Sequence, residues 1–345
     1  MKELLRELSL AFGPSGCEDR VREIIKNYLA KNMPKGAELY EDRNGGVFLH
    51  LPREGKPKLM ISAHMDEIGF MITHIEESGH LRFGCVGGID TIILSSKRVV
   101  SESGRLGSIV VKPVHLLSKD ERGQKPNLSD LLIDIGATSR EEAEKLTYVG
   151  EYFTFDSDYV EYGDGLVKCK ALDDRLGCAI MCKTVSDIKE KGIVPEYDLY
   201  FAFTCREEVG YSGAFGAANA INPDYAVVIE SKAVADVFGV SEQKKVCELG
   251  AGAVISFADL GTIYDREFVA HVMSLCDKKD IKYQVHRVVS GGNDSHNIQG
   301  ACNGCRVALL SAASRYIHSP ADVVHYDDLD AIYKALTEVI SERGI

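Results

Sequence analysis

Segments with the apolar period of a strand alternate with segments that have the period of a helix, and this alternation limits the chain to few fold classes. It begins with two amphipathic helices at residues 2–12 and 18–31, followed by strands at 47–51 and 58–63. From residue 161 it continues through helix 174–191, strand 198–204, helix 213–219, strand 225–229, helix 265–279, strand 307–310 and helix 329–343. Such alternation predicts a largely parallel sheet with helices on both faces.

Residues 69–160 interrupt this alternation. Their apolar runs are short and separated by glycine-rich turns, and they indicate strands at 70–75, 81–86, 98–100, 108–112 and 131–135. Because 345 residues exceed the size at which one core usually keeps growing, a second, smaller domain is expected. The sequence therefore predicts a three-layer α/β/α domain, residues 1–68 plus 161–345, that is interrupted by an inserted all-β domain.

Charge, cysteine content and hydropathy argue against several classes of partner. Lys and Arg number 40 against 52 Asp and Glu, and the net charge of −12 repels phosphate backbones and anionic lipid surfaces. The N-terminal residues carry charges throughout their apolar part, unlike a signal peptide, and no later segment has the length of a membrane span. We expect a cytoplasmic protein that binds neither nucleic acid nor membranes. Its ten cysteines should be reduced, although Cys302 and Cys305 have the C-x-x-C spacing of a redox pair.

Charged residues follow the apolar strands at the edge where open α/β sheets bind their ligands. His64 follows the strand at 58–63, and Asp66 lies two residues later, so that an extended backbone turns both side chains the same way. Asp66 can then hydrogen-bond the ring nitrogen that His64 does not offer to a metal. Taken alone, an H-x-D triplet is more often a capped strand end, so the metal hypothesis depends on further residues.

Four carboxylates occupy comparable positions. Asp173 precedes a helix, where it fits either an N-cap or a carboxylate that bridges two cations. Glu207 and Glu208 follow the strand at 198–204 and form either a solvated acidic turn or a pair that a cation or a proton must neutralise. Two metal ions would account for both glutamates, since one glutamate can bind a metal while the other takes a proton from water. Glu230 directly follows the strand at 225–229.

His318 completes the set of candidate ligands. It lies in a loop that Pro320 helps to fix, and it can point back toward the other residues. The sequence thus predicts that side chains from distant stretches meet in one cleft around two divalent cations. Histidine and carboxylate ligands accept zinc, cobalt, manganese or iron, so the native metal stays open.

Five motifs, in the order SAHMDEIGF, KALDDRLGC, CREEVGYSGA, GGNDSH and RYIHSP, give the chain a specific resemblance. It resembles the tetrahedral aminopeptidases, a family of co-catalytic metallopeptidases that includes glutamyl aminopeptidases and proteins labelled cellulase M. The resemblance covers essentially the whole chain, including the β insert. It implies a zinc-peptidase-like catalytic domain and a barrel-like insert that serves oligomerisation and access to the active site.

Carried over residue by residue, the resemblance implies a ligand set. His64 and Glu230 would bind one metal ion. Glu208 and His318 would bind the other, and Asp173 would bridge the two. Family members usually contain two zinc or cobalt ions per subunit. They assemble from dimers into hollow tetrahedral dodecamers that degrade short peptides.

The same resemblance makes Glu207 the general base and Asp66 the partner that orients His64. It implies an exopeptidase that removes N-terminal residues from short peptides with a metal-activated water. Glu230 departs from the family pattern, which usually has aspartate, and glutamate here is more familiar in carboxypeptidases and deacylases of the wider clan. A carboxypeptidase or amide deacylase is therefore an alternative. A glycoside hydrolase, suggested by the cellulase label, and a non-catalytic scaffold are two others, and the side-chain preference stays open.

Overall fold

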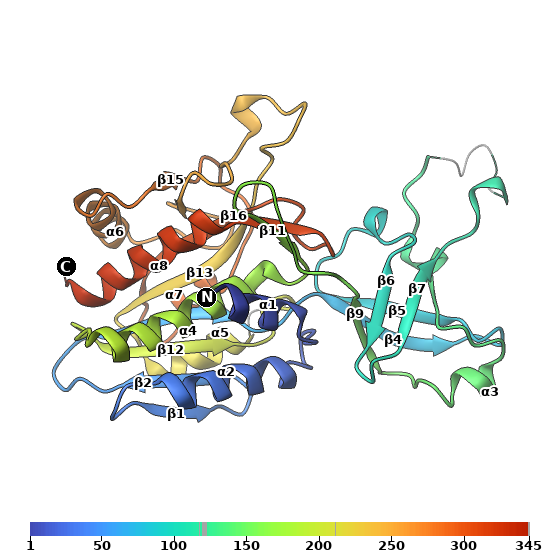
Figure 1. Ribbon diagram of the computed structural model, residues 1–345, viewed down its shortest axis with the longest axis horizontal. Coiled ribbons are helices and arrows are strands. Elements are labelled where there is room, and N and C mark those ends of the chain that lie inside the picture. Colours follow the sequence, from blue (N-terminus) through green and yellow to red (C-terminus); the bar gives the residue numbers. More distant parts are fainter. Residues whose placement is uncertain (117, 119–122, 211, 344–345) are drawn as a thin grey trace.

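The protein consists of an α/β body with a β-barrel beside it (Figure 1). The computed structural model describes residues 1–116, 118, 123–210 and 212–343. The first part of the α/β body leads through β3 into the barrel, and the chain returns from the barrel to complete the body. The predicted fold class, an α/β domain interrupted by an all-β, barrel-like insert, is confirmed.

Eight strands form the main sheet, and the four at its centre are parallel. The spatial order is β1 (Glu38–Glu41), β2 (Val47–Leu51), β12 (Asp198–Thr204), β3 (Lys58–His64), β13 (Tyr225–Ala233), β16 (Arg306–Ser314), β14 (Ala253–Ile255) and β15 (Tyr283–Val285). Neighbours from β12 to β16 pair in parallel, whereas β2 with β12 and β14 with β16 are antiparallel. Central parallel strands are buried on both faces, which explains the nearly continuous apolar runs of β3 and β12.

Helices cover both faces of the sheet. They are α1 (Lys2–Leu10), α2 (Asp19–Asn32), α4 (Leu172–Lys191), α5 (Ser212–Ile221), α6 (Arg266–Lys278), α7 (Ser295–Gln299) and α8 (Tyr326–Ser341). α4 packs on β3 and β13 and is itself covered by α1, α2 and α8, so it is buried around most of its circumference. α5 and α7 pack together on the other face (Figure 1). Within the described residues, no helix has the length and apolar character that a membrane crossing requires.

The insert is a closed six-stranded barrel with a core of its own. Its strands follow the order β4 (Gly69–Ile75), β5 (Leu81–Val86), β8 (Leu132–Asp134), β7 (Leu106–Val110), β6 (Arg98–Ser101) and β9 (Tyr152–Phe155). Phe70 packs edge-on against Phe83 and Phe155, with ring centroids 5.2 Å apart in both pairs. A short helix, α3 (Arg140–Ala143), precedes β9, and a small sheet of β10 (Val160–Tyr162), β11 (Leu166–Cys169) and β17 (Asp322–His325) follows it.

The start of α2 differs from what its sequence indicates. The S-x-x-E spacing of Ser15 and Glu18 predicts a capping box, and this prediction is wrong. Glu18 is the N-cap residue without a side-chain cap, and its carboxylate accepts a hydrogen bond from the Gly16 N–H at 2.8 Å. The Ser15 hydroxyl instead donates a charge-assisted hydrogen bond to the buried Asp66 carboxylate at 2.5 Å.

A buried ion pair joins the barrel to the α/β body. Lys170 donates to both carboxylate oxygens of Glu67, at 2.7 and 2.8 Å, and both side chains are almost fully buried. Glu67 also accepts hydrogen bonds from the Gly13 N–H at 3.1 Å and from the Thr154 hydroxyl of β9 at 2.9 Å. The Glu67 carboxylate therefore contacts the N-terminal segment through Gly13, the barrel through Thr154 and the segment before α4 through Lys170.

We predict that Glu67→Gln lowers the free energy of unfolding by about 3 kcal/mol, because it leaves the buried Lys170 ammonium without its counter-charge. Urea unfolding followed by circular dichroism measures the change. Asp330→Asn is the matched control, since the exposed ion pair of Asp330 with Lys334 contributes little. Equal midpoints for the two variants would show that the buried pair does not hold the junction.

Candidate metal centre

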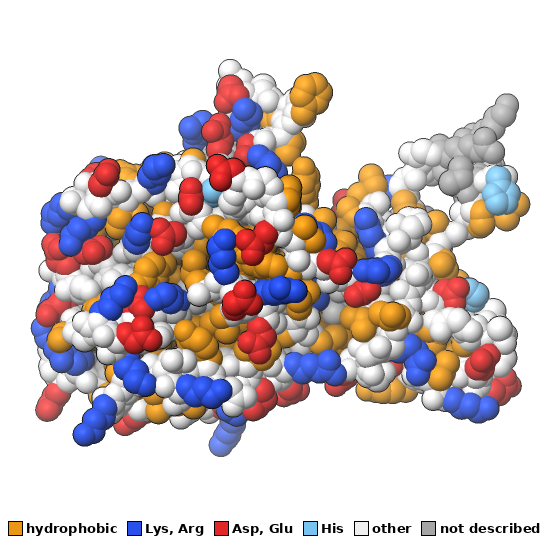
Figure 2. Space-filling view, in the orientation of Figure 1, with side chains coloured by type: hydrophobic (Ala, Val, Ile, Leu, Met, Phe, Trp, Pro, Cys, Tyr) orange, Lys and Arg blue, Asp and Glu red, His pale blue; other side chains and the backbone are white. Residues whose placement is uncertain are grey.

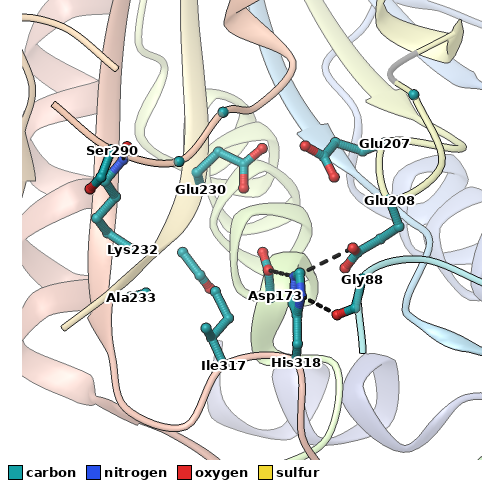
Figure 3. Close-up of a pocket in the computed structure, with 14 residues that line it drawn as sticks. Gly88, Asp173, Glu207, Glu208, Glu230, Lys232, Ala233, Ser290, Ile317 and His318 are labelled. Atoms are coloured by element: carbon teal, nitrogen blue, oxygen red, sulfur yellow. Dashed lines mark hydrogen bonds and ion pairs between the residues drawn. The ribbon is translucent and has the colours of Figure 1, made fainter. Parts of the chain in front are cut away.

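A cavity of about 580 Å³ opens at the carboxyl ends of the central strands. Five of the side chains predicted from the sequence line it: Asp173, Glu207, Glu208, Glu230 and His318. In Figure 3, Glu207 and Glu208 lie on one side of the cavity, Glu230 lies opposite them, and Asp173 and His318 lie between. Residues that are more than 140 positions apart in the sequence thus meet in one cleft.

Strand pairing explains how these residues reach the same level. β3 and β12 end together because His64 pairs with Thr204. The sequence predicts that the next strand ends one residue before Glu230, but β13 continues along β16 as far as Ala233. Its pairing with β3 stops at Val228, opposite Ser62, so Glu230 lies two residues beyond the last position paired with β3, and its side chain lines the cavity. Glu230 is therefore inside a strand and not after it.

His64 lies behind the carboxylates and is only 1% exposed. Its Nε2 is 3.5 Å from Asp173 Oδ1, 3.8 Å from Glu230 Oε2 and 3.9 Å from Glu207 Oε2. Its Nδ1 is 3.1 Å from the backbone carbonyl oxygen of Asp66 and 3.4 Å from the Asp66 carboxylate. Nδ1–H can donate to that carbonyl, so Nε2 faces the three carboxylates and has the orientation of a metal ligand once it gives up its proton.

His318 takes a matching position on the other side. Its Nε2 is 3.5 Å from Asp173 Oδ2 and 3.3 Å from Glu208 Oε2. Its Nδ1 is 2.7 Å from the carbonyl oxygen of Gly88, which belongs to the barrel insert between β5 and β6. The barrel thus supplies the hydrogen bond that turns this ring toward the cavity.

Asp173 presents one oxygen to each histidine. Asp173 Oδ1 and Glu230 Oε1 are buried and have no hydrogen-bond partner among the described residues, which is costly unless a ligand occupies the space. The side chains of His64, Asp174 and Glu230 also have ligand atoms that lie within 4.8 Å of one another. Asp174, however, already accepts from the backbone N–H groups of Gly177 and His64 at 3.2 and 3.3 Å and does not line the cavity. Asp173 is the better ligand.

The cavity concentrates negative charge, whereas acidic and basic side chains are interspersed on the face shown in Figure 2. Burial and nearby carboxylates raise the pKa of Glu207 to about 10 and that of Glu208 to about 8. Burial alone would lower the pKa of His318, but Asp173 and Glu208 raise it to about 9. The cluster therefore holds protons that two divalent cations could replace.

Asp66 fixes the turn that carries both glutamates. It is fully buried, and its carboxylate accepts hydrogen bonds from the backbone N–H groups of Glu207 and Glu208, each at 3.1 Å. The Ser15 hydroxyl is its third donor. Sequence reasoning missed Ser15, and no motif could reveal it, because the contact joins the N-terminal segment to the end of β3 through tertiary structure.

Comparison with known proteins identifies similar chains. A family model described as M42 glutamyl aminopeptidase matches residues 45–334. A putative aminopeptidase of Acetivibrio thermocellus is 33% identical over 340 residues, which cover 99% of this chain and 98% of that protein. The structure of a TET aminopeptidase from Thaumarchaeota archaeon SCGC AB-539-E09 is 31% identical, with a TM-score of 0.95 and coverage of 99% and 96%. The Pyrococcus horikoshii TET1 peptidase, which can assemble into a tetrahedron or a large octahedral shell, is 33% identical, with a TM-score of 0.88 and coverage of 99% of both chains.

We predict that Asp66→Asn weakens the binding of divalent cations by about 10- to 100-fold, because a side-chain NH₂ then opposes one of the backbone N–H groups that hold the glutamate turn. Competition with a chromogenic chelator measures the affinity for zinc. Ser15→Ala is the control, since it removes one donor and leaves both backbone contacts of Asp66 in place. Wild-type zinc affinity in a folded Asp66→Asn protein would contradict this role of Asp66.

Proposed function

Because the chain belongs to the M42 glutamyl aminopeptidase family and is a peptidase, we propose that it is a two-metal exopeptidase that removes N-terminal residues from short peptides. The observation that carries the proposal is the position of Asp173, whose two oxygens each lie 3.5 Å from the Nε2 of a different histidine. A carboxylate between two imidazoles is the arrangement that a pair of bridged cations needs.

The proposed ligands divide into two sets. His64 and Glu230 would hold one cation, Glu208 and His318 would hold the other, and Asp173 would contact both. Two bound cations would supply the Lewis acidity that polarises a peptide carbonyl and lowers the pKa of a water. The proposed metals are zinc or cobalt, as the family resemblance implies, with manganese or iron as substitutes, because imidazole and carboxylate ligands accept all four.

Glu207 is the proposed general base. It lines the cavity, and its carboxylate is 3.9 Å from His64 Nε2, at the edge of the ligand cluster. Its pKa falls from the raised value when neighbouring carboxylates are neutralised, so that it can accept a proton from the attacking water. The same carboxyl group then gives this proton to the leaving amine. Asp66 acts through this residue by holding its backbone N–H.

The acidic cavity favours a peptide that places its free N-terminal amine in the cavity. Glu230 Oε1 is buried without a partner among the described residues, so it can accept a hydrogen bond from an N-terminal ammonium. The second candidate function is a carboxypeptidase or amide deacylase of the same clan, and the glutamate at position 230 favours it. A glycoside hydrolase would have no use for two histidines that face the carboxylates.

The proposed assembly follows the relatives. The chain matches 99% of the Pyrococcus horikoshii TET1 peptidase, so we extend the proposal to a homo-oligomer built from dimers, a tetrahedral dodecamer. In this proposal the barrel contributes to assembly and to access, since its Gly88 already contacts His318 at the rim of the cavity.

We predict that Glu207→Gln keeps two metal ions per chain and lowers kcat by a factor of about 10³, because the amide cannot accept the proton. Elemental analysis gives the metal content and steady-state kinetics give kcat. Glu208→Gln is the informative comparison, since it should lose metal as well as activity. Glu242→Gln, on an exposed turn, is the inert control. Full turnover by a metal-replete Glu207→Gln protein would remove Glu207 from the role of base.

A second prediction concerns the end of the peptide from which residues are released. One peptide is prepared with a free N-terminus, with an acetylated N-terminus and with an amidated C-terminus, and the products are identified by mass spectrometry. We expect release of the N-terminal residue from the free and the amidated peptides, none from the acetylated peptide, and loss of all cleavage after dialysis against a chelator. Cleavage of the acetylated peptide from its C-terminus would establish the carboxypeptidase instead.

A further inference from the structure

A buried aspartate lies behind the proposed metal ligands, and the proposed chemistry gives it no role. Asp322, the first residue of β17, is 1% exposed. We propose that Asp322 is a positioning residue for the cation assigned to Glu208 and His318, and that it holds the ligands of this His318 site in binding geometry. The inference rests on the proposed function and deepens it by naming a residue that controls how one of the two sites is filled.

A second, much smaller cavity brings Asp322 next to three of the proposed ligands. Its volume is about 10 Å³, the room of about one water, and its lining includes Asp173, Glu208, His318 and Asp322. In Figure 3, dashed lines join the His318 ring to Asp173 and to Glu208, so these three side chains form one contact group. The two ligands assigned to the other cation alone are not among the described residues that line the small cavity. Asp322 therefore borders the His318 site.

Asp322 also closes the loop that carries His318. The Ser314 hydroxyl at the end of β16 donates to the Asp322 carboxylate, and the backbones of Arg315 and Val323 pair through two hydrogen bonds of 3.0 Å. The loop between these contacts holds His318 at a φ of 58°, which is unfavourable for a residue with a Cβ. Such a backbone persists only where its surroundings enforce it, so the closed base of the loop supports the position of the His318 ring.

The same carboxylate lies beside the start of α4, which carries Asp173. β17 pairs with β11, and Cys169 of β11 lies opposite Asp322, four residues before Asp173. Burial raises the pKa of Asp322 to about 7 and the Asp173 carboxylate adds to this rise, whereas the Ser314 hydroxyl and the Asp173 backbone N–H lower it. The Asp322 carboxylate is thus close to both the backbone and the side chain of the proposed bridging ligand.

Asp322 lacks a counter-charge of its own. Its Oδ2 is buried and has no hydrogen-bond partner among the residues that the structure describes. Lys170 lines the same small cavity, but its ammonium donates to both oxygens of Glu67 and to the carbonyl oxygen of Ala11. A buried carboxylate in this state is costly, and a cation in the His318 site would offset part of the cost. The charge of Asp322 and that cation therefore stabilise each other.

The test measures cation affinity and does not depend on turnover. Full-length apo protein is titrated with zinc in competition with a chromogenic chelator, and wild type should bind two ions. Asp322→Asn should weaken one ion by about 10- to 100-fold and the other by less than about threefold, because the negative charge is lost and a side-chain NH₂ opposes the Asp173 backbone N–H. Unchanged affinity for both ions in a folded Asp322→Asn protein would overturn the proposal.

Two further variants separate positioning from stability. Asp328→Asn is the matched control, because Asp328 is also fully buried and accepts backbone N–H groups, those of Gly250 and Gly252 at 2.9 and 2.7 Å. It should lower the midpoint of urea unfolding and leave both zinc affinities unchanged. Asp322→Glu keeps the charge, and its extra methylene can use the room of about one water, so zinc affinity should stay within about fivefold of wild type. Equal losses of zinc affinity in Asp328→Asn and Asp322→Asn would show that Asp322 acts only through stability.

A double-mutant cycle identifies the affected ion. His318→Ala removes a ligand of the His318 site, and this protein should bind one ion tightly. Adding Asp322→Asn to it should change the affinity for the remaining ion by less than about threefold, because both substitutions act on the same site. A further loss of about tenfold or more would assign Asp322 to the other cation, and the proposal would be wrong.

Ser314→Ala tests the same contact if Asp322→Asn does not fold. It removes the hydroxyl that donates to Asp322 and should weaken one zinc ion by about fivefold. Wild-type affinity in this variant would then overturn the role of Asp322. The proposed function fails in a different way, since a wild type that shows the expected zinc affinities and releases no N-terminal residue from any peptide would contradict the aminopeptidase and leave the role of Asp322 in place.

Discussion

Four carboxylates lie in one cleft, and the rest of the structure must offset the electrostatic repulsion between them. Asp173, Glu207, Glu208 and Glu230 lie together at the ends of the central strands, and their mutual repulsion is offset in part by His64 and His318. Oxygens of Asp173 and Glu230 still lack partners among the described residues. Such a site is stable only when protons or cations neutralise it, and the rest of the molecule holds the six side chains near one another despite this cost.

Two features outside the cleft provide that restraint. The Asp66 carboxylate binds consecutive backbone N–H groups at Glu207 and Glu208, so the acidic turn is held through its backbone and its side chains stay free for ligands. The barrel contributes the Gly88 carbonyl that orients His318, and the buried pair of Glu67 with Lys170 links the barrel to the sheet. The insert is therefore part of the site, and a change in its position would alter the set of ligands.

The sequence predicted the fold class and the clustering because both follow from local periodicity. Strands that alternate with helices place their carboxyl ends at one sheet edge, so the residues after β3 and β12 had to converge. The end of β13 was not predictable from apolar pattern, since polar residues such as Glu230 continue to pair with β16. The Ser15 hydroxyl was assigned to a helix cap because nothing local indicates a buried acceptor 51 residues away.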